Sequence, residues 1–254
     1  MDTATTSNPS DPTIRWEHVI DRINALRRGL LAVVVALLLG TAVGWGVADR
    51  VFEFLAAPLT TALAEADRDP RLVFTHLSDP FVIYFSVAML LGLLLALPVL
   101  MSLFWRIIAP LGLGRGAAKA FVFVVSSTAL FLLGLAFGYW VLLPFVVRYL
   151  LGVAEQFRYA VTIREYLRFA LRMLLAMGIS AQLPLVSFVL ARFGLVTARR
   201  MLRWLPYAVL AAFVLAALVT PPDGISQVLV AVPMLVLYLI GVVVAAFAAP
   251  TRRA

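Results

Sequence analysis

The chain has 254 residues, of which 63% are hydrophobic and 13% charged, with a formal net charge of +8 and a mean hydropathy of +1.02. This composition excludes an ordinary water-soluble domain, because such a fold needs many more polar residues to cover its core. The chain has no cysteine, which excludes disulfides and thiolate metal sites. We therefore expect an all-α integral membrane protein.

Six apolar stretches fill most of the sequence; a helix needs roughly 20 such residues to cross the hydrocarbon core, so the second and third are long enough to tilt and the fifth is short. Residues 1–14 predict a flexible cytoplasmic tail, followed by one membrane domain over 15–249 and a second tail at 250–254. Strands are excluded because the alternation of a membrane barrel is missing. The predicted spans are 29–48, 81–108, 120–147, 169–191, 205–219 and 225–248.

Two connections carry specific expectations. The longest, residues 49–80, holds an amphipathic piece over 51–64 that we expect Pro58 to break and that should lie along the outer membrane surface. The fifth span is short, and the turn Thr220-Pro221-Pro222-Asp223 behind it is too small for a domain. Spans five and six are therefore expected to form a tight hairpin.

The basic residues predict the orientation of the bundle. They gather before span one and in alternate connections, whereas the acidic residues fall in the other connections. By the positive-inside rule, both termini face the cytoplasm (N-in/C-in) in a multi-pass protein of the cytoplasmic (inner) membrane. Anionic headgroups of membrane lipid are the partners available to these bases, so no nucleic acid is expected.

Residues suited to catalysis are sparse. His18 and His76 lie outside the spans, and Ser180 has no histidine beside it in any span. The spans contain no clustered carboxylates, and the chain has no Walker loop. The sequence therefore predicts no enzyme, no cofactor and no metal site.

Several motifs resemble the TatC family, the multispanning core subunit of the twin-arginine protein translocase. The resemblance runs from about residue 23 to residue 248, and the Thr-Pro-Pro-Asp turn is its strongest single signal. The motifs include Leu26-Arg27-Arg28, Ala57-Pro58-Leu59, Ala109-Pro110-Leu111, Gly134, Tyr139, Pro144, Tyr166, Gly178, Pro184, Thr220-Pro221-Pro222-Asp223, Gln227 and Pro233-Met234.

The resemblance implies a function without covalent chemistry. The chain would bind twin-arginine signal peptides at its cytoplasmic face and recruit single-helix partners of the TatA and TatB types. Together with other copies of itself, it would export folded cargo on proton-motive force. Thr220 and Gln227 match the polar cluster that binds a partner helix. Helix capping is an equally good interpretation of Thr220, whereas the place of Gln227 inside a span favours a partner contact.

The sequence departs from the family at four glutamate positions, which are occupied by Ala25, Gly116, Gln182 and Leu239. The first two glutamates are the expected partners of the signal's arginines, because a guanidinium in a groove of low dielectric constant needs a bidentate anion.

The candidates for a relocated signal-peptide site are Asp21, Arg27 and Ile107. Asp21 lies one helical turn before Ala25 on the same face. A plain role for Asp21, as a partner of the helix dipole or of surface charges, stays open.

Two alternative functions and one packing question also stay open. A divergent TatC-like paralogue would keep the scaffold without direct twin-arginine recognition. A small-molecule transporter would need a polar cavity at mid-membrane and pseudo-symmetric halves, and the hydropathy shows no internal repeat.

The pairs Gly40/Gly44 and Gly134/Gly138 have helix-contact spacing, which we assign to internal packing rather than to dimerisation.

Overall fold

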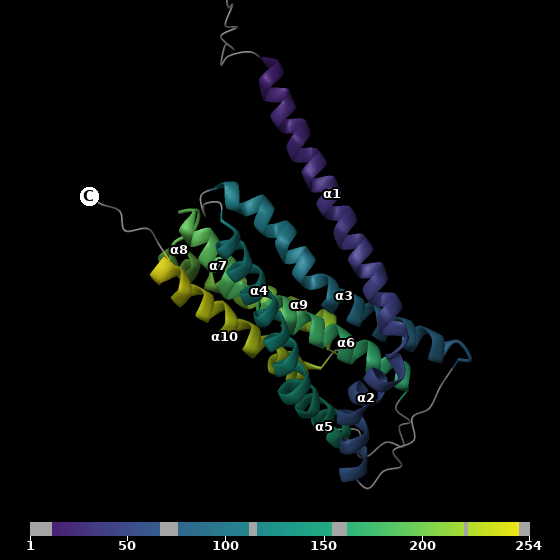
Figure 1. The fold of residues 1–254 in the computed structure, drawn as a ribbon. Coiled ribbons are helices and arrows are strands. Elements are labelled where there is room, and N and C mark those ends of the chain that lie inside the picture. Colours follow the sequence, from purple (N-terminus) through teal and green to yellow (C-terminus); the bar gives the residue numbers. More distant parts are fainter. Residues whose placement is uncertain (1–11, 67–75, 112–115, 154–161, 221–222, 249–254) are drawn as a thin grey trace, which may run out of the picture.

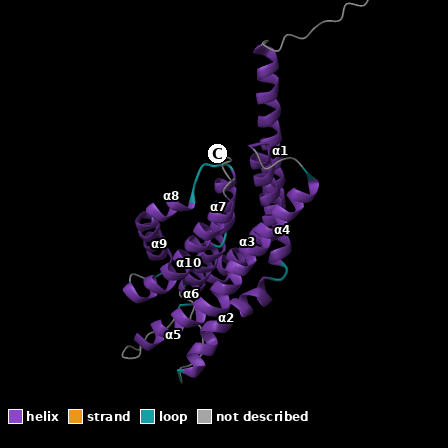
Figure 2. Ribbon diagram, turned by 90° about the vertical axis from the view of Figure 1, so that its left-hand side faces the viewer, coloured by secondary structure: helices purple, strands orange, loops and turns teal. Residues whose placement is uncertain are grey.

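The computed structural model is a bundle of helices (Figure 1), and every described element in Figure 2 is helix or loop. It describes residues 12–66, 76–111, 116–153, 162–220 and 223–248; of residues 12–23 and 111 only the backbone is considered. The elements are α1 (Pro12–Trp45), α2 (Ala48–Glu65), α3 (Asp79–Ile108), the 3-10 turn η1 (Ala109–Leu111), α4 (Ala117–Phe137), the π-helical η2 (Gly138–Leu142), α5 (Leu143–Val153), α6 (Ile163–Ser180), α7 (Leu183–Arg192), α8 (Ala198–Arg203), α9 (Leu205–Val219) and α10 (Gly224–Ala248).

Within the described ranges, five helical stretches are long and apolar enough to cross a membrane, which confirms an all-α membrane fold. They are Asn24–Trp45, Asp79–Ile108, Ala117–Val153, Ile163–Arg192 and Gly224–Ala248. α9 is apolar but has only 15 residues, as expected for the short fifth span. The count of six spans and the cytoplasmic side of both termini stay predictions.

The bundle has two distinct ends (Figure 1). We call one of them the terminal end. There α1 and α4 begin, α3 and α10 end, and α8 lies. The loop end carries α2, the starts of α3 and α6, the end of α5 and the turn between α9 and α10. At the terminal end α1 projects beyond its neighbours, as both views show (Figures 1 and 2).

Glycines set the closest helix crossings. A Cβ added to Gly40 on α1 would lie 2.9 Å from the Cα of Gly92 on α3, and one added to Gly44 would lie 2.9 Å from the carbonyl oxygen of Ala88. At Gly134 on α4, a Cβ would lie 2.6 Å from a carbonyl oxygen of α6. Because these helices approach where side chains are missing, the predicted role of the glycines in internal packing is confirmed.

Prolines interrupt two of the predicted continuous spans. The third runs on to Val153, but it widens into η2 immediately before Pro144, whose ring cannot fit the regular α-helical ladder. The fourth predicted span, 169–191, lies within the apolar stretch Ile163–Arg192, but that stretch is interrupted: α6 ends at Ser180 and α7 begins at Leu183. Pro184 explains the break, since it cannot donate an N–H to the carbonyl of Ser180.

The main core lies toward the loop end. Leu59 and Leu63 of α2 are buried in one apolar cluster with Val146 of α5 and Met173 of α6. The apolar face of α2 is therefore packed on the other helices of the bundle. Burying this face fixes α2 against α3, α5 and α6.

Candidate functional site

The structure brings three of the sequence-selected signal-peptide positions to the terminal end. Arg27 is exposed on α1, Ile107 is 44% exposed in the last turn of α3, and Gly116 is exposed at the N-cap of α4. Asp21 lies on α1, but its side chain is outside the described part of the structure.

The packing of α1 on α3 relates these positions to one another. The two helices run antiparallel, with Gly40 against Gly92 and Gly44 against Ala88. Continuing this register toward the terminal end brings Ala25 to the level of Ile107. One of the two positions that lack the family's glutamate therefore lies level with a candidate on the neighbouring helix.

Charge is distributed very unequally between the two ends. Every carboxylate among the described side chains belongs to the loop end: Asp49, Glu53, Glu65, Asp79, Glu165 and Asp223. The described terminal end carries bases only: Arg27, Arg28, Arg106, Lys119, Arg192, Arg199, Arg200 and Arg203. An arginine-bearing ligand at that end would find no anion among these side chains.

An apolar pocket of about 330 Å³ opens between α3, α4 and α7, in the half of the bundle near the terminal end. Its walls include Phe104 and Ile108 of α3, Phe123 of α4 and Val186 of α7. The polar residue on its wall is Gln182, whose side-chain amide donates to the carbonyl oxygen of Ser127 at 2.9 Å. Gln182 thus ties the break between α6 and α7 to α4 and leaves the pocket largely apolar.

Pro58 does not break α2, contrary to the sequence-based expectation. The helix continues from Ala48 to Glu65 although Pro58 cannot donate an N–H to the carbonyl of Phe54. The hydroxyl of Tyr139 donates to that carbonyl oxygen instead, at 2.6 Å, and the hydroxyl of Tyr166 donates to the carbonyl of Leu55 at 2.8 Å. Two tyrosines of the membrane helices therefore anchor α2 where proline weakens it.

The hairpin between α9 and α10 uses its polar residues in internal hydrogen bonds. The Thr220 hydroxyl donates to the carbonyl of Ala216 at 2.9 Å, and the Gln227 amide donates across to Phe213 of α9 at 2.9 Å. Asp223 accepts from the backbone N–H and the hydroxyl of Ser226, so it caps α10. Pro221 and Pro222 lie outside the described residues.

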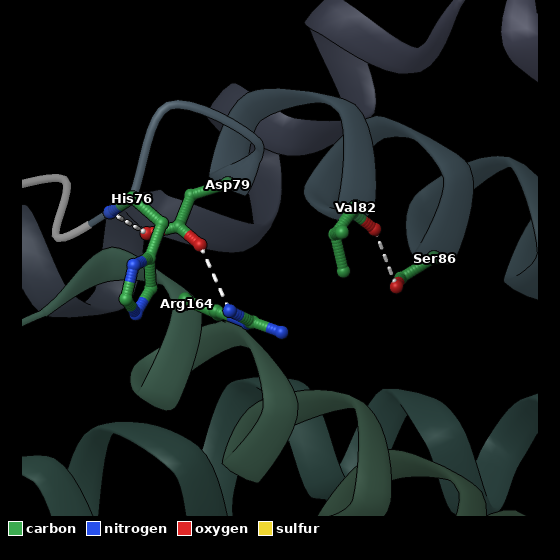
Figure 3. Close-up of polar contacts among 5 residues, drawn as sticks. All are labelled: His76, Asp79, Val82, Ser86 and Arg164. Atoms are coloured by element: carbon green, nitrogen blue, oxygen red, sulfur yellow. Dashed lines mark hydrogen bonds and ion pairs between the residues drawn. The ribbon is translucent and has the colours of Figure 1, made fainter.

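A buried ion pair at the loop end was not anticipated from the sequence (Figure 3). Asp79 is fully buried at the start of α3, and its carboxylate accepts from Arg164 of α6 at 3.1 Å and from the backbone N–H of His76 at 2.9 Å. The sequence did contain one sign of this pair. Arg164, Arg168 and Arg172 follow a connection that the positive-inside rule assigns to the outer face, where few basic residues are expected. Arg164 therefore links α6 to α3, two spans that are far apart in the sequence.

The described part of the chain contains no group of three or more metal-binding side chains. Its exposed sites are an apolar pocket and charged surfaces, which suit the binding of polypeptide or lipid.

Comparison with known proteins gives a consistent result. The family profile described as Sec-independent protein translocase protein (TatC) matches residues 21–233. A protein of that name from Desulforapulum autotrophicum is 36% identical over 226 residues, covering 88% of this chain and 82% of the relative. One from Koribacter versatilis is 32% identical, covering 100% of this chain and 94% of the relative.

A solved structure shares the fold. The crystal structure of a twin-arginine translocase receptor, TatC, superposes with a TM-score of 0.80 at 30% identity, covering 89% of this chain and 98% of that chain.

Proposed function

The chain belongs to the TatC family of Sec-independent protein translocases, and on that premise we propose that its terminal end is a receptor for twin-arginine signal peptides. Membership of this family makes the chain a subunit of a protein transport system rather than an enzyme. The observation that carries the proposal is the apolar pocket between α3, α4 and α7, which reaches Ile108 at the terminal end.

The pocket suits one part of such a peptide. A signal peptide carries an apolar segment behind its charged region. With that segment against Phe104 and Val186, the charged region would reach the level of Ile107 and of the first turns of α1. Burial of the apolar segment supplies most of the binding energy, and the charges then set the register.

We assign the anchoring of the arginine pair to Asp21. It lies one helical turn before Ala25, hence on the same face of α1, and Ala25 is level with Ile107. A carboxylate there can receive two parallel N–H bonds from a guanidinium. Arg27, six residues further along α1, repels a peptide whose arginines enter too far toward the bundle.

Binding of a labelled twin-arginine peptide to the purified chain tests this assignment. Asp21→Ala should weaken binding about tenfold or more, because a charge-assisted bidentate bond is lost. Asp49→Ala removes an exposed carboxylate at the loop end and should leave the affinity unchanged. Equal affinities of the two variants would contradict the assignment.

The competing function is that of a paralogue that uses the scaffold without direct signal recognition. It is favoured by the lack of any carboxylate among the described side chains of the terminal end. Deleting the gene in its own host separates the two. A receptor predicts that a folded fluorescent reporter with a twin-arginine signal stays in the cytoplasm until the gene is restored. Export that continues unchanged after the deletion would favour the paralogue.

We further propose that the hairpin of α9 and α10 binds single-helix partners of the TatA and TatB types. Gln227 is half-buried in a span, and its side-chain oxygen remains an acceptor after the amide has bonded to Phe213. A polar group on a visiting helix would pair with it where water cannot compete.

The amount of single-helix protein that co-purifies with the chain measures this contact. Gln227→Leu should lower it, whereas Gln182→Leu, which removes the glutamine on the other side of the bundle, should not. A loss that is equal in both variants would show that the effect is not specific to the hairpin.

The orientation is part of the same proposal. The chain would lie in the cytoplasmic membrane with both termini in the cytoplasm, because the bases of the terminal end follow the positive-inside rule. A reporter enzyme active only in the cytoplasm should therefore work when fused to either terminus.

A further inference from the structure

We propose that the face between α3 and α6 at the loop end binds the phosphodiester of an anionic phospholipid. The proposal is independent of the signal-peptide function, since it concerns the opposite end of the bundle. It starts from three arginines of α6, Arg164, Arg168 and Arg172, at successive intervals of four residues.

The three arginines line one concave surface. A pocket of about 150 Å³ lies between them and Val82, Ile83 and Ser86 of α3. Its remaining walls are leucines of α6. The surface thus combines three cationic side chains with apolar side chains from both helices, which complements a lipid that joins an anionic headgroup to acyl chains.

The charge of this surface is only partly neutralised by the protein. Arg164 pairs with Asp79 through one terminal nitrogen, while its buried Nε has no partner among the described residues. In Figure 3 its guanidinium lies between the two helices, with one edge toward Asp79 and the other pointing away along the side where Ser86 lies. Arg168 and Arg172 are exposed, and no carboxylate of the described chain pairs with either.

Such an arrangement needs an anion. Like charges four residues apart on a helix repel each other, and an arginine inside an apolar span is costly without a counter-charge. Arg172 lies roughly 12 Å along the helix from Arg164. Side chains on a helix lean toward its N-terminus, so the long Arg172 side chain can extend back toward the level where headgroups lie.

The position selects lipid rather than another anion. The pocket lies near the start of two membrane spans, at the level of the headgroup region, where lipid phosphodiesters are the nearest abundant anions. Guanidinium matches phosphate oxygens with two parallel hydrogen bonds. Val82 and Ile83 give the pocket an apolar wall on α3, against which the glycerol and the start of an acyl chain can pack.

Native mass spectrometry of the detergent-purified chain tests the proposal with phosphatidylglycerol and phosphatidylcholine as probes. The chain should retain phosphatidylglycerol and release phosphatidylcholine. R168Q/R172Q should lower retention about tenfold, because two charge-assisted contacts are lost. The matched control R199Q/R203Q removes two exposed charges at the terminal end and should retain the lipid as the unmodified chain does.

A second double variant distinguishes a loss of lipid binding from misfolding. R168K/R172K keeps both charges and should weaken retention about threefold, because a lysine cannot make the paired contact. Retention that is unchanged in both double variants would overturn the proposal. Displacement of the lipid by inorganic phosphate at equal concentration would also overturn it in favour of a free-phosphate site. The proposal would also be overturned if an acidic polypeptide co-purified with the unmodified chain and was lost from R168Q/R172Q while the retained lipid did not change.

Discussion

The two ends of the bundle differ in how their polar groups are used. At the loop end, Asp79 is bonded to Arg164, Tyr139 is bonded to α2, and Asp223 caps α10. At the terminal end, Arg27 and Ile107 are exposed, and no described carboxylate offers a fixed partner. The described bonds between helices that involve a carboxylate lie at the loop end, whereas Arg27 at the terminal end is exposed and has no described carboxylate beside it.

This difference indicates a division of work within one small fold. The hydrogen bonds and the ion pair at the loop end tie α2 to η2 and α6, and α3 to α6. Substitutions of these bonded residues should therefore reduce stability first, and those at the terminal end should reduce binding without unfolding the chain.

The largest expected loss of stability follows Asp79→Ala. This change leaves the Arg164 guanidinium without its carboxylate and the His76 N–H without its acceptor, which should cost about 3 kcal/mol. Thermal unfolding in detergent measures the cost. Adding Arg164→Ala should recover part of it, because no uncompensated charge then remains. A double variant less stable than Asp79→Ala alone would contradict the ion-pair account.

The crossing of α1 and α3 provides the next test. In Gly92→Ala the new Cβ would lie 2.7 Å from the backbone nitrogen of Thr41 and 2.9 Å from the carbonyl oxygen of Leu37. Separating the helices should cost about 2 kcal/mol in the same unfolding experiment. Gly152→Ala is the control, since nothing lies within 4 Å of its added Cβ. If both variants unfold alike, the crossing is not limited by Gly92.

A smaller effect sharpens the account of α2. Tyr139→Phe removes the donor to the Phe54 carbonyl and should cost about 1 to 1.5 kcal/mol. Pro58→Ala in the same chain should restore part of the loss, because an alanine N–H can bond to that carbonyl. Tyr207→Phe, at an exposed tyrosine without a described hydrogen bond, should change little. Absence of any rescue by Pro58→Ala would refute the compensation.

The smallest expected effect belongs to an exposed ion pair at the same end. Arg148 and Glu65 lie 2.9 Å apart, but their side chains are 59% and 50% exposed. Glu65→Ala should therefore cost at most about 0.5 kcal/mol, since solvent screens such pairs. A loss as large as that of Asp79→Ala would mean that burial does not distinguish the two pairs.

The spans were predictable because hydrophobicity and length are local properties. The fifth span, 205–219, coincides with α9, and the predicted sixth begins one residue after α10 does. The consequences of prolines were harder to predict, because they depend on neighbours distant in the sequence. At Pro58 the helix continues and Tyr139 donates to the carbonyl that the proline leaves free, whereas near Pro184 helix α6 ends at Ser180.

The candidate site was predictable only in part. Motif positions placed Arg27 and Ile107 at one end, and helix geometry agrees. The buried pairing of Asp79 with Arg164 was missed, because the two residues are far apart in the chain and only the packing of α3 on α6 joins them. Thr220 and Gln227 were selected for partner binding, and the structure adds internal hydrogen bonds that the sequence could not specify.

The most direct measurement places a photo-crosslinking residue at one exposed position of each end, Ile107 and Phe81, and adds a twin-arginine signal peptide. The account predicts a crosslink from position 107 that disappears with a Lys-Lys peptide and with Asp21→Ala, and none from position 81. Equal crosslinking from both positions, or none from position 107, would contradict it.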